Sequence, residues 1–165
     1  MKRILIFMML ASLSACNNSG KEPAEEPNIE ADTAAATTSA TVNTGESDLY
    51  VWKSSPDYTK EKNPGLRKEI IQEDSLIRGL NRMHENVLLE KVKRSGDTLY
   101  TEIKDSEYLS EQMGTTGAEM YLADVILNLT EVPGINYVNI QLKEGSHMQP
   151  GTWNKQSFAK YKPVN

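Results

Sequence analysis

The clearest hydrophobic pattern in this chain lies between residues 116 and 129. Large apolar side chains recur there every three or four positions, which is the spacing of one face of an α-helix. The stripe consists of Ala118, Tyr121, Leu122, Val125, Ile126 and Leu129. Thr116 and Glu119 fit the capping box, in which each side chain satisfies a free backbone N–H group. The pattern predicts a core-facing helix that starts near Thr116 and is ended by Pro133-Gly134.

A second helical stripe follows Ser75. Its apolar positions are Leu76, Ile77, Leu80 and Met83, with polar residues between them. This spacing predicts an amphipathic helix of about three turns, weakened by Gly79 in its middle.

Alternating patterns predict strands. Residues 87–94 and 98–104 flank Ser95-Gly96-Asp97. Leu88 and Val92 in the first segment, and Leu99 and Ile103 in the second, alternate with charged or polar residues, which predicts a hairpin. Residues 135–142 predict another strand. One face of it carries Val138, Ile140 and Leu142, and the other carries Tyr137, Asn139 and Gln141.

The remaining parts of the folded region give weaker patterns. Residues 49–52 predict a first strand, residues 53–65 a polar loop, and residues 66–72 a short second strand. Residues 145–165 have little periodicity, and we expect Trp153 and Phe158 to hold this tail against the core. Two helices against one sheet predict an α+β fold, a two-layer sandwich on a small mixed or antiparallel sheet.

The N-terminus has the pattern of a bacterial secretory signal. Met1-Lys2-Arg3 precedes the apolar run 4–11, which is too short to span a bilayer. The following Leu13-Ser14-Ala15-Cys16 resembles the lipobox of bacterial lipoproteins, where cleavage precedes a cysteine that is then lipidated. This predicts a signal peptide over residues 1–15 and acyl chains on Cys16 that hold the mature protein at a membrane.

A change of composition separates this anchor from the folded region. Residues 17–47 are rich in Ala, Thr, Ser, Glu and Asn and contain no aromatic residue, so they bury too little surface to offset ordering. Together with Cys16 they form the predicted linker 16–47, a tether that spans roughly 30 Å. Residues 48–165 fit one small domain.

The net negative charge of the chain argues against some classes of binding partner. Removal of residues 1–15 takes the formal net charge from −5 to −7. An acidic chain without a basic cluster in its sequence argues against nucleic acid. It also leaves the acyl anchor to carry membrane attachment. Cys16 is the only cysteine, so no disulfide is expected.

The segments 113–122 (MGTTGAEMYL) and 129–138 (LTEVPGINYV) carry a family resemblance. They resemble the GerMN domain, with its Gly-rich helix entry, its Leu-Thr-Glu helix exit and a Val-containing strand followed by glycine, here Gly145. The resemblance implies a compact α+β domain similar to the ring-building motif of membrane-complex proteins, in an exported or membrane-attached bacterial protein. The family has no established catalytic activity, so no active-site residue is carried over.

Catalytic patterns are weak. The two histidines, His84 and His147, are far apart and lack metal-site spacing. We interpret His84 as structural and His147 as a loop residue. The chain has no G-x-S-x-G motif. Gly114-Thr115-Thr116-Gly117 lacks the lysine of a phosphate-binding loop, and we interpret it as a flexible helix entry.

These observations favour a non-enzymatic, lipid-anchored cell-envelope protein without cofactor or metal. Its domain is expected to contact an envelope protein or peptidoglycan through a sheet edge or a tyrosine-rich face. The aromatic residues considered for that face are Tyr50, Trp52, Tyr58, Tyr100 and Tyr108. One alternative is a cell-wall hydrolase or esterase that uses His147 and a carboxylate. Another is a structural homo-oligomer of an envelope complex.

Overall fold

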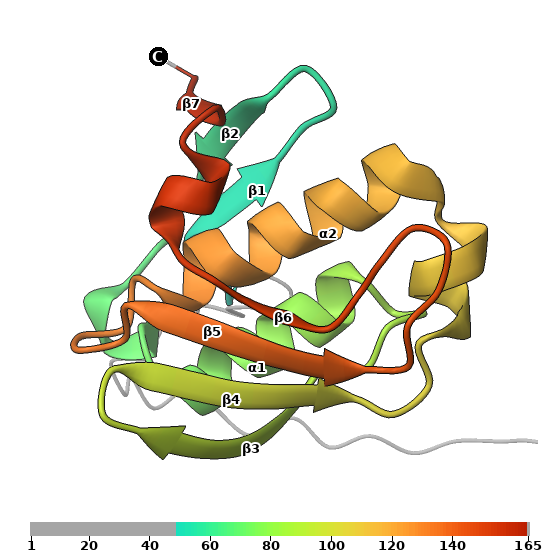
Figure 1. Ribbon diagram of the computed structural model, residues 1–165. Helices are drawn as coiled ribbons and strands as arrows, with labels where there is room; N and C mark the ends of the chain where they lie inside the picture. Colours follow the sequence, from blue (N-terminus) through green and yellow to red (C-terminus); the bar gives the residue numbers. More distant parts are fainter. Residues whose placement is uncertain (1–48, 165) are drawn as a thin grey trace, which may run out of the picture. The chain divides into compact units, whose positions relative to one another are not determined.

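The computed structural model describes residues 49–164 (Figure 1). The predicted signal peptide, Cys16 and the predicted linker lie outside the described residues. In chain order the elements are β1 (Trp52–Ser54), β2 (Thr59–Lys62), the 3-10 helix η2 (Lys68–Ile70), α1 (Glu73–Met83), β3 (Glu90–Ser95), β4 (Thr98–Ile103), the π-helical segment η3 (Tyr108–Gln112), α2 (Gly114–Leu129), β5 (Tyr137–Leu142), β6 (Gly151–Trp153), the 3-10 helix η4 (Lys155–Phe158) and β7 (Lys162–Pro163). They form the predicted α+β fold.

The larger sheet is mixed and has the strand order β3-β4-β5-β6. Strands β4 and β5 are parallel, and the two outer pairings are antiparallel. Helices α1 and α2 pack on one face of this sheet (Figure 1). Leu99, Ile103, Val138 and Ile140 point toward the helices and are fully buried. This part of the molecule confirms the predicted sandwich of two helices on a small mixed sheet.

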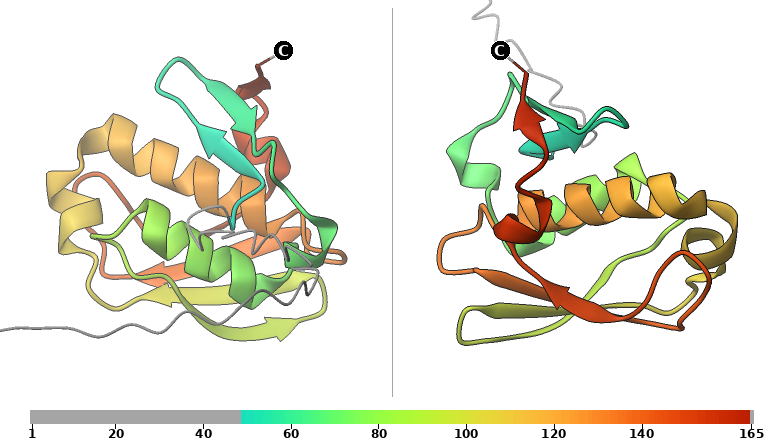
Figure 2. Two further views of the ribbon diagram at one scale, coloured as in Figure 1. Left: turned by 180° about the vertical axis from the view of Figure 1, so that it is seen from behind. Right: turned by 45° about the horizontal axis from the view of Figure 1, so that its top comes forward.

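A second sheet, β1-β2-β7, lies on the other side of α2 (Figure 2). Helix α2 is therefore covered by both sheets, and its burial extends beyond the predicted stripe. Ala123, Asp124, Leu127 and Asn128 are buried in addition to the stripe residues. None of the helices within residues 49–164 is long and apolar enough to cross a membrane.

Two predictions for residues 49–72 are wrong, and the bounds of a third are shifted. The predicted first strand is present but spans Trp52–Ser54, the predicted loop 53–65 contains β2, and the predicted strand 66–72 contains a 3-10 helix. Strand β2 reads Thr-Lys-Glu-Lys and has no apolar alternation, because neither of its faces is fully buried. Tyr58, with a φ of 61°, makes the turn that reverses the chain before β2.

The predicted capping box at the start of α2 is also wrong. Helix α2 begins at Gly114, directly after η3, and Met113 at its N-cap has helical backbone angles. A capping side chain needs an extended N-cap residue, so Thr116 and Glu119 do not serve there. The helix ends at Leu129, before Pro133, and the hydroxyl of Thr130 donates to the carbonyl of Ile126.

The predicted hairpin is confirmed, but the two alternating apolar residues of its first segment are exposed and do not face the core. Leu88 and Val92 are 60% and 53% exposed. The pairing of β3 with β4 shifts register between Lys91 and Lys93, which places Val92 in a bulge at the sheet edge. In the tail, Phe158 is buried and Trp153 is half-buried against the core, while the strands β6 and β7 had no predicted counterpart.

Gly79 lies where α1 meets the chain segment that enters β1. A Cβ atom at this position would lie 1.9 Å from the carbonyl oxygen of Leu49. We expect Gly79→Ala to lower the free energy of unfolding by about 1–3 kcal/mol, because the backbone at Leu49 must move. Urea denaturation measures this, with the exposed Arg78→Ala as a control. A Gly79→Ala protein as stable as the parent would contradict the contact.

Candidate functional site

The four-stranded sheet leaves its outer face without a covering helix or strand in the described part of the chain (Figures 1 and 2). The register places Tyr100 of β4 beside Asn139 of β5, and Thr98 beside Tyr137. Tyr137 is 40% exposed. Two aromatic rings thus lie on neighbouring strands of this uncovered face, Tyr137 exposed and Tyr100 half-buried.

Amide side chains on this face are held in place by hydrogen bonds. The Asn139 amide donates to the hydroxyl of Thr152 at 2.7 Å and to the carbonyl of Gly151 at 3.2 Å. Gln141 donates to the side-chain oxygen of Asn139 at 2.8 Å. Ordered amides beside aromatic rings suit a partner that offers both hydroxyl groups and apolar C–H surface. We call Tyr100, Tyr137, Asn139, Gln141 and Thr152 the outer sheet face.

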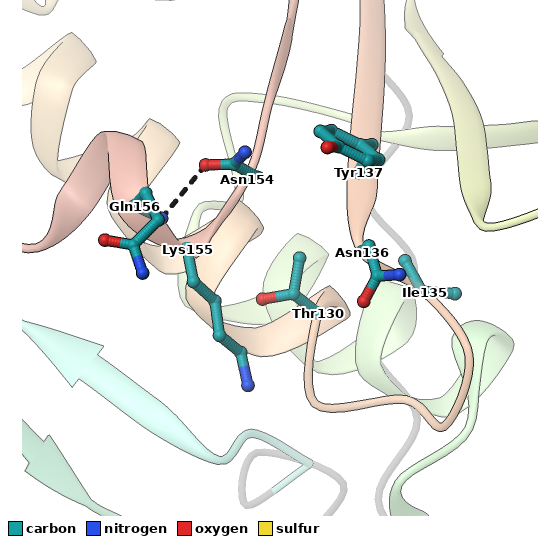
Figure 3. Close-up of a pocket in the computed structure, with 7 residues that line it drawn as sticks. All are labelled: Thr130, Ile135, Asn136, Tyr137, Asn154, Lys155 and Gln156. Carbon is teal, nitrogen blue, oxygen red and sulfur yellow. Dashed lines mark hydrogen bonds between the residues drawn. The ribbon is translucent and has the colours of Figure 1, made fainter.

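A polar hollow of about 220 Å³ adjoins this face at Tyr137 (Figure 3). It lies between the end of α2, the start of β5 and the helix η4. The residues around it are Thr130, Ile135, Asn136, Tyr137, Asn154, Lys155 and Gln156. The side chain of Asn154 accepts from the backbone of Gln156 and Ser157 and so fixes the start of η4. The hollow offers hydrogen-bonding groups and one aromatic wall.

A second polar group is buried between α1, α2 and β1. Asp124 is 2% exposed, and one of its carboxylate oxygens accepts from the backbone N–H of Ser54 at 2.6 Å. The other lies 3.0 Å from Nε2 of His84. The ring of Tyr121 packs edge-on against His84, with the centroids 5.0 Å apart. Asp124 thereby connects three elements.

This cluster has some of the residue types of a hydrolytic site. His84 borders a polar hollow of about 400 Å³ that also contacts Tyr108 and Met113. The hydroxyl of Ser54 and that of Tyr121 are buried without a hydrogen-bond partner among the described residues, and burial raises the pKa of Tyr121. Both hydroxyls are thus closed off from solvent, and Asp124 holds β1 against α2. The arrangement therefore serves to hold β1 and the end of α1 against α2.

His147 lies in a different part of the molecule. Its Nδ1 is 3.1 Å from the hydroxyl of Thr115, and its backbone N–H donates to Ser110. Glu111 accepts from the hydroxyl and the backbone N–H of Ser146, and these two bonds, followed by the neighbouring His147, lower the pKa of Glu111. The structure therefore places the carboxylate of Glu111 near His147, but this carboxylate is hydrogen-bonded to Ser146.

The aromatic residues considered for a tyrosine-rich face belong to separate elements. Trp52 is in β1 and Tyr58 in the turn before β2, whereas Tyr100 is in β4 and Tyr108 in η3. Of these, only Tyr100 lies on the outer sheet face. The sequence indicated its neighbours, because the alternation of residues 135–142 placed Tyr137, Asn139 and Gln141 together.

Two polar residues of α2 are buried although the sequence pattern did not predict a role for them. Asp124 and Asn128 are separated by one helical turn within an otherwise apolar helix. That spacing was the signal available for a polar contact inside the core. Within residues 49–164 no group of three His, Cys, Asp or Glu side chains is arranged to hold a metal ion.

Comparison with known proteins identifies no relative: no family model, no curated protein and no solved structure matches this chain.

Proposed function

We propose that this chain is a non-enzymatic, lipid-anchored protein of the bacterial cell envelope. In this proposal Cys16 carries the acyl anchor, residues 17–47 form the tether, and the domain binds an envelope partner, either peptidoglycan or another envelope protein. The observation that carries the binding function is the uncovered outer sheet face. On this face, Tyr100 and Tyr137 lie beside the side-chain amides of Asn139 and Gln141, which hydrogen bonds hold in place.

The resemblance of residues 113–138 to the GerMN domain supports the same proposal. Members of that family are largely exported or membrane-attached, and the α+β fold of this chain agrees with the fold that the resemblance implies. The secretory pattern of residues 1–16 is an independent argument for export.

The chemistry of the described residues supports binding better than catalysis. Asp124 is committed to Ser54 and His84 inside the core, and Glu111 is committed to Ser146. A general acid or base must reach the reacting atom of a substrate. On the outer sheet face, by contrast, rings and amides are accessible to a large partner.

The test is co-sedimentation of the protein with isolated peptidoglycan and with cross-linked envelope proteins. We expect Tyr137→Ala to weaken binding by about ten-fold, because a central aromatic contact commonly dominates an interface. Tyr58→Ala is the matched control, since Tyr58 is similarly exposed, at 44%, but lies beside the other sheet. Equal binding by the parent and Tyr137→Ala proteins would contradict the assignment of this face.

A further inference from the structure

The three-stranded sheet and the tail that joins it are basic, although the protein is acidic. Residues 52–62 and 155–163 carry six lysines and two acidic residues. The rest of the described chain carries nine basic and fourteen acidic residues. The two lysine-rich segments become neighbours only because β7 pairs with β2 and η4 packs on α2.

Trp52 lies at the centre of this basic region. The Lys60 ammonium lies 4.6 Å from the centroid of the Trp52 ring, and the Lys62 ammonium lies 6.0 Å from it. The indole N–H of Trp52 donates to Glu131 at 3.1 Å, and Lys155 forms an ion pair with the same carboxylate oxygen at 3.0 Å. Figure 3 shows the Lys155 side chain extending from η4 alongside Thr130.

The pKa of Lys60 responds to the lysines around it. Partial burial lowers the pKa of Lys60, the charge of Glu131 opposes that change, and Lys155 and Lys162 lower the pKa further. In the geometry, the ammonium groups of Lys60 and Lys62 lie over Trp52, and that of Lys155 pairs with Glu131, the carboxylate bonded to the indole. An added anion would relieve the repulsion among these lysines.

We infer that Lys60, Lys62 and Lys155 form a binding site for a phosphate-type oxyanion beside the ring of Trp52. Lysine ammonium groups bind phosphate as compact charges with several donors. Two sources present this chemistry: free phosphate compounds and the headgroups of anionic phospholipids. The second source is within reach if Cys16 anchors the chain, because each lysine near an anionic membrane strengthens attachment by about five-fold.

The experiment uses residues 16–165, the chain expected after removal of the predicted signal peptide, with Cys16→Ser, so that neither acyl chains nor the apolar run 4–11 dominates vesicle binding. Binding is measured with inorganic phosphate, with phosphatidylglycerol vesicles and with phosphatidylcholine vesicles. We expect Lys60→Gln to weaken binding of the anionic probe by about five-fold or more, and Lys155→Gln to do the same. Lys60→Arg, which retains the charge, is expected to retain most of the binding and so to separate loss of charge from loss of fold.

Lys93→Gln is the matched control. Lys93 also lies over an aromatic ring, 5.2 Å from the centroid of Tyr100, but it belongs to the four-stranded sheet. Its replacement changes the net charge equally and is expected to leave binding unchanged. Binding of phosphate by the parent protein, lost in Lys60→Gln, supports a free phosphate source, and binding of phosphatidylglycerol vesicles alone supports a lipid source. Absence of binding to both probes, or equal losses in Lys60→Gln and Lys93→Gln, would overturn the inference.

Discussion

Replacing Asn128 by alanine is expected to remove about 4 kcal/mol from the free energy of unfolding. Asn128 is fully buried in α2, and its side chain acts as a pairing partner for the backbone at β1. The side-chain oxygen accepts from the N–H of Val51 at 2.5 Å and of Trp52 at 3.0 Å. The amide donates to the carbonyls of Trp52 and Asp124, both at 2.7 Å.

The size of this effect follows from what the truncation leaves behind. Two N–H groups and one carbonyl at the start of β1 lose their partner, and a buried unpaired group costs about 1–3 kcal/mol. Because a domain of this size is stable by about 5–15 kcal/mol, the loss is a large fraction of the total. Urea denaturation followed by circular dichroism measures it.

Asn139→Ala provides the comparison for Asn128→Ala. Asn139 also makes side-chain hydrogen bonds, but on the solvent-exposed face of the four-stranded sheet. We expect it to cost about 0.5 kcal/mol, as is usual for surface positions. If Asn128→Ala were no more destabilising than Asn139→Ala, the attachment of β1 to α2 through this side chain would be wrong.

Cys16→Ser is expected to move the protein from the membrane fraction to the soluble fraction. Its sulfur is the proposed site of acylation, and each buried methylene of an acyl chain contributes about 0.8 kcal/mol to membrane attachment. Serine cannot form the thioether, so the anchor is lost while the tether and domain remain. Cell fractionation and intact-mass spectrometry of the mature protein measure the two consequences.

Asn18→Ser is the control for this change, since it introduces the same residue two positions beyond the proposed cleavage site. It is expected to leave both the membrane fraction and the added mass of the acyl chains unchanged. Equal membrane retention of the parent and Cys16→Ser proteins, without a change in mass, would remove the basis for a lipid anchor.

The elements predicted correctly are those that pack one side against the common core. Helix α1, β4 and β5 each bury one face and expose the other, so the period of their apolar residues reports their structure. Helix α2 was predicted from its stripe, but its contact with a second sheet was not. The signals of that contact were two polar residues, Asp124 and Asn128, inside an apolar helix.

The three-stranded sheet could not be predicted from the spacing of apolar residues. Its strands have two to four residues and contain lysine, threonine and proline where buried strands have aliphatic residues. Pairing β2 with β7 also joins segments about 100 positions apart. The contact is specified by partners elsewhere in the chain, such as Asn128, and local sequence does not contain that information.

The same separation explains which surfaces were predicted. The outer sheet face could be predicted in part from the sequence, because Tyr137, Asn139 and Gln141 alternate along one strand. The basic region around Trp52 was not visible, because Lys60 and Lys155 are 95 positions apart in a chain whose net charge is −5. No basic cluster is therefore evident along the sequence, whereas the fold assembles one.

The most direct test of the account is cross-linking from the outer sheet face in living cells. A photoreactive amino acid at position 137 of the full-length protein, followed by mass spectrometry, captures whatever contacts this face, and the same group at position 58 is the control. The account predicts one defined envelope partner, protein or peptidoglycan, captured from position 137 and not from position 58. Failure to capture any partner above the control would contradict the proposal that this domain works by binding through that face.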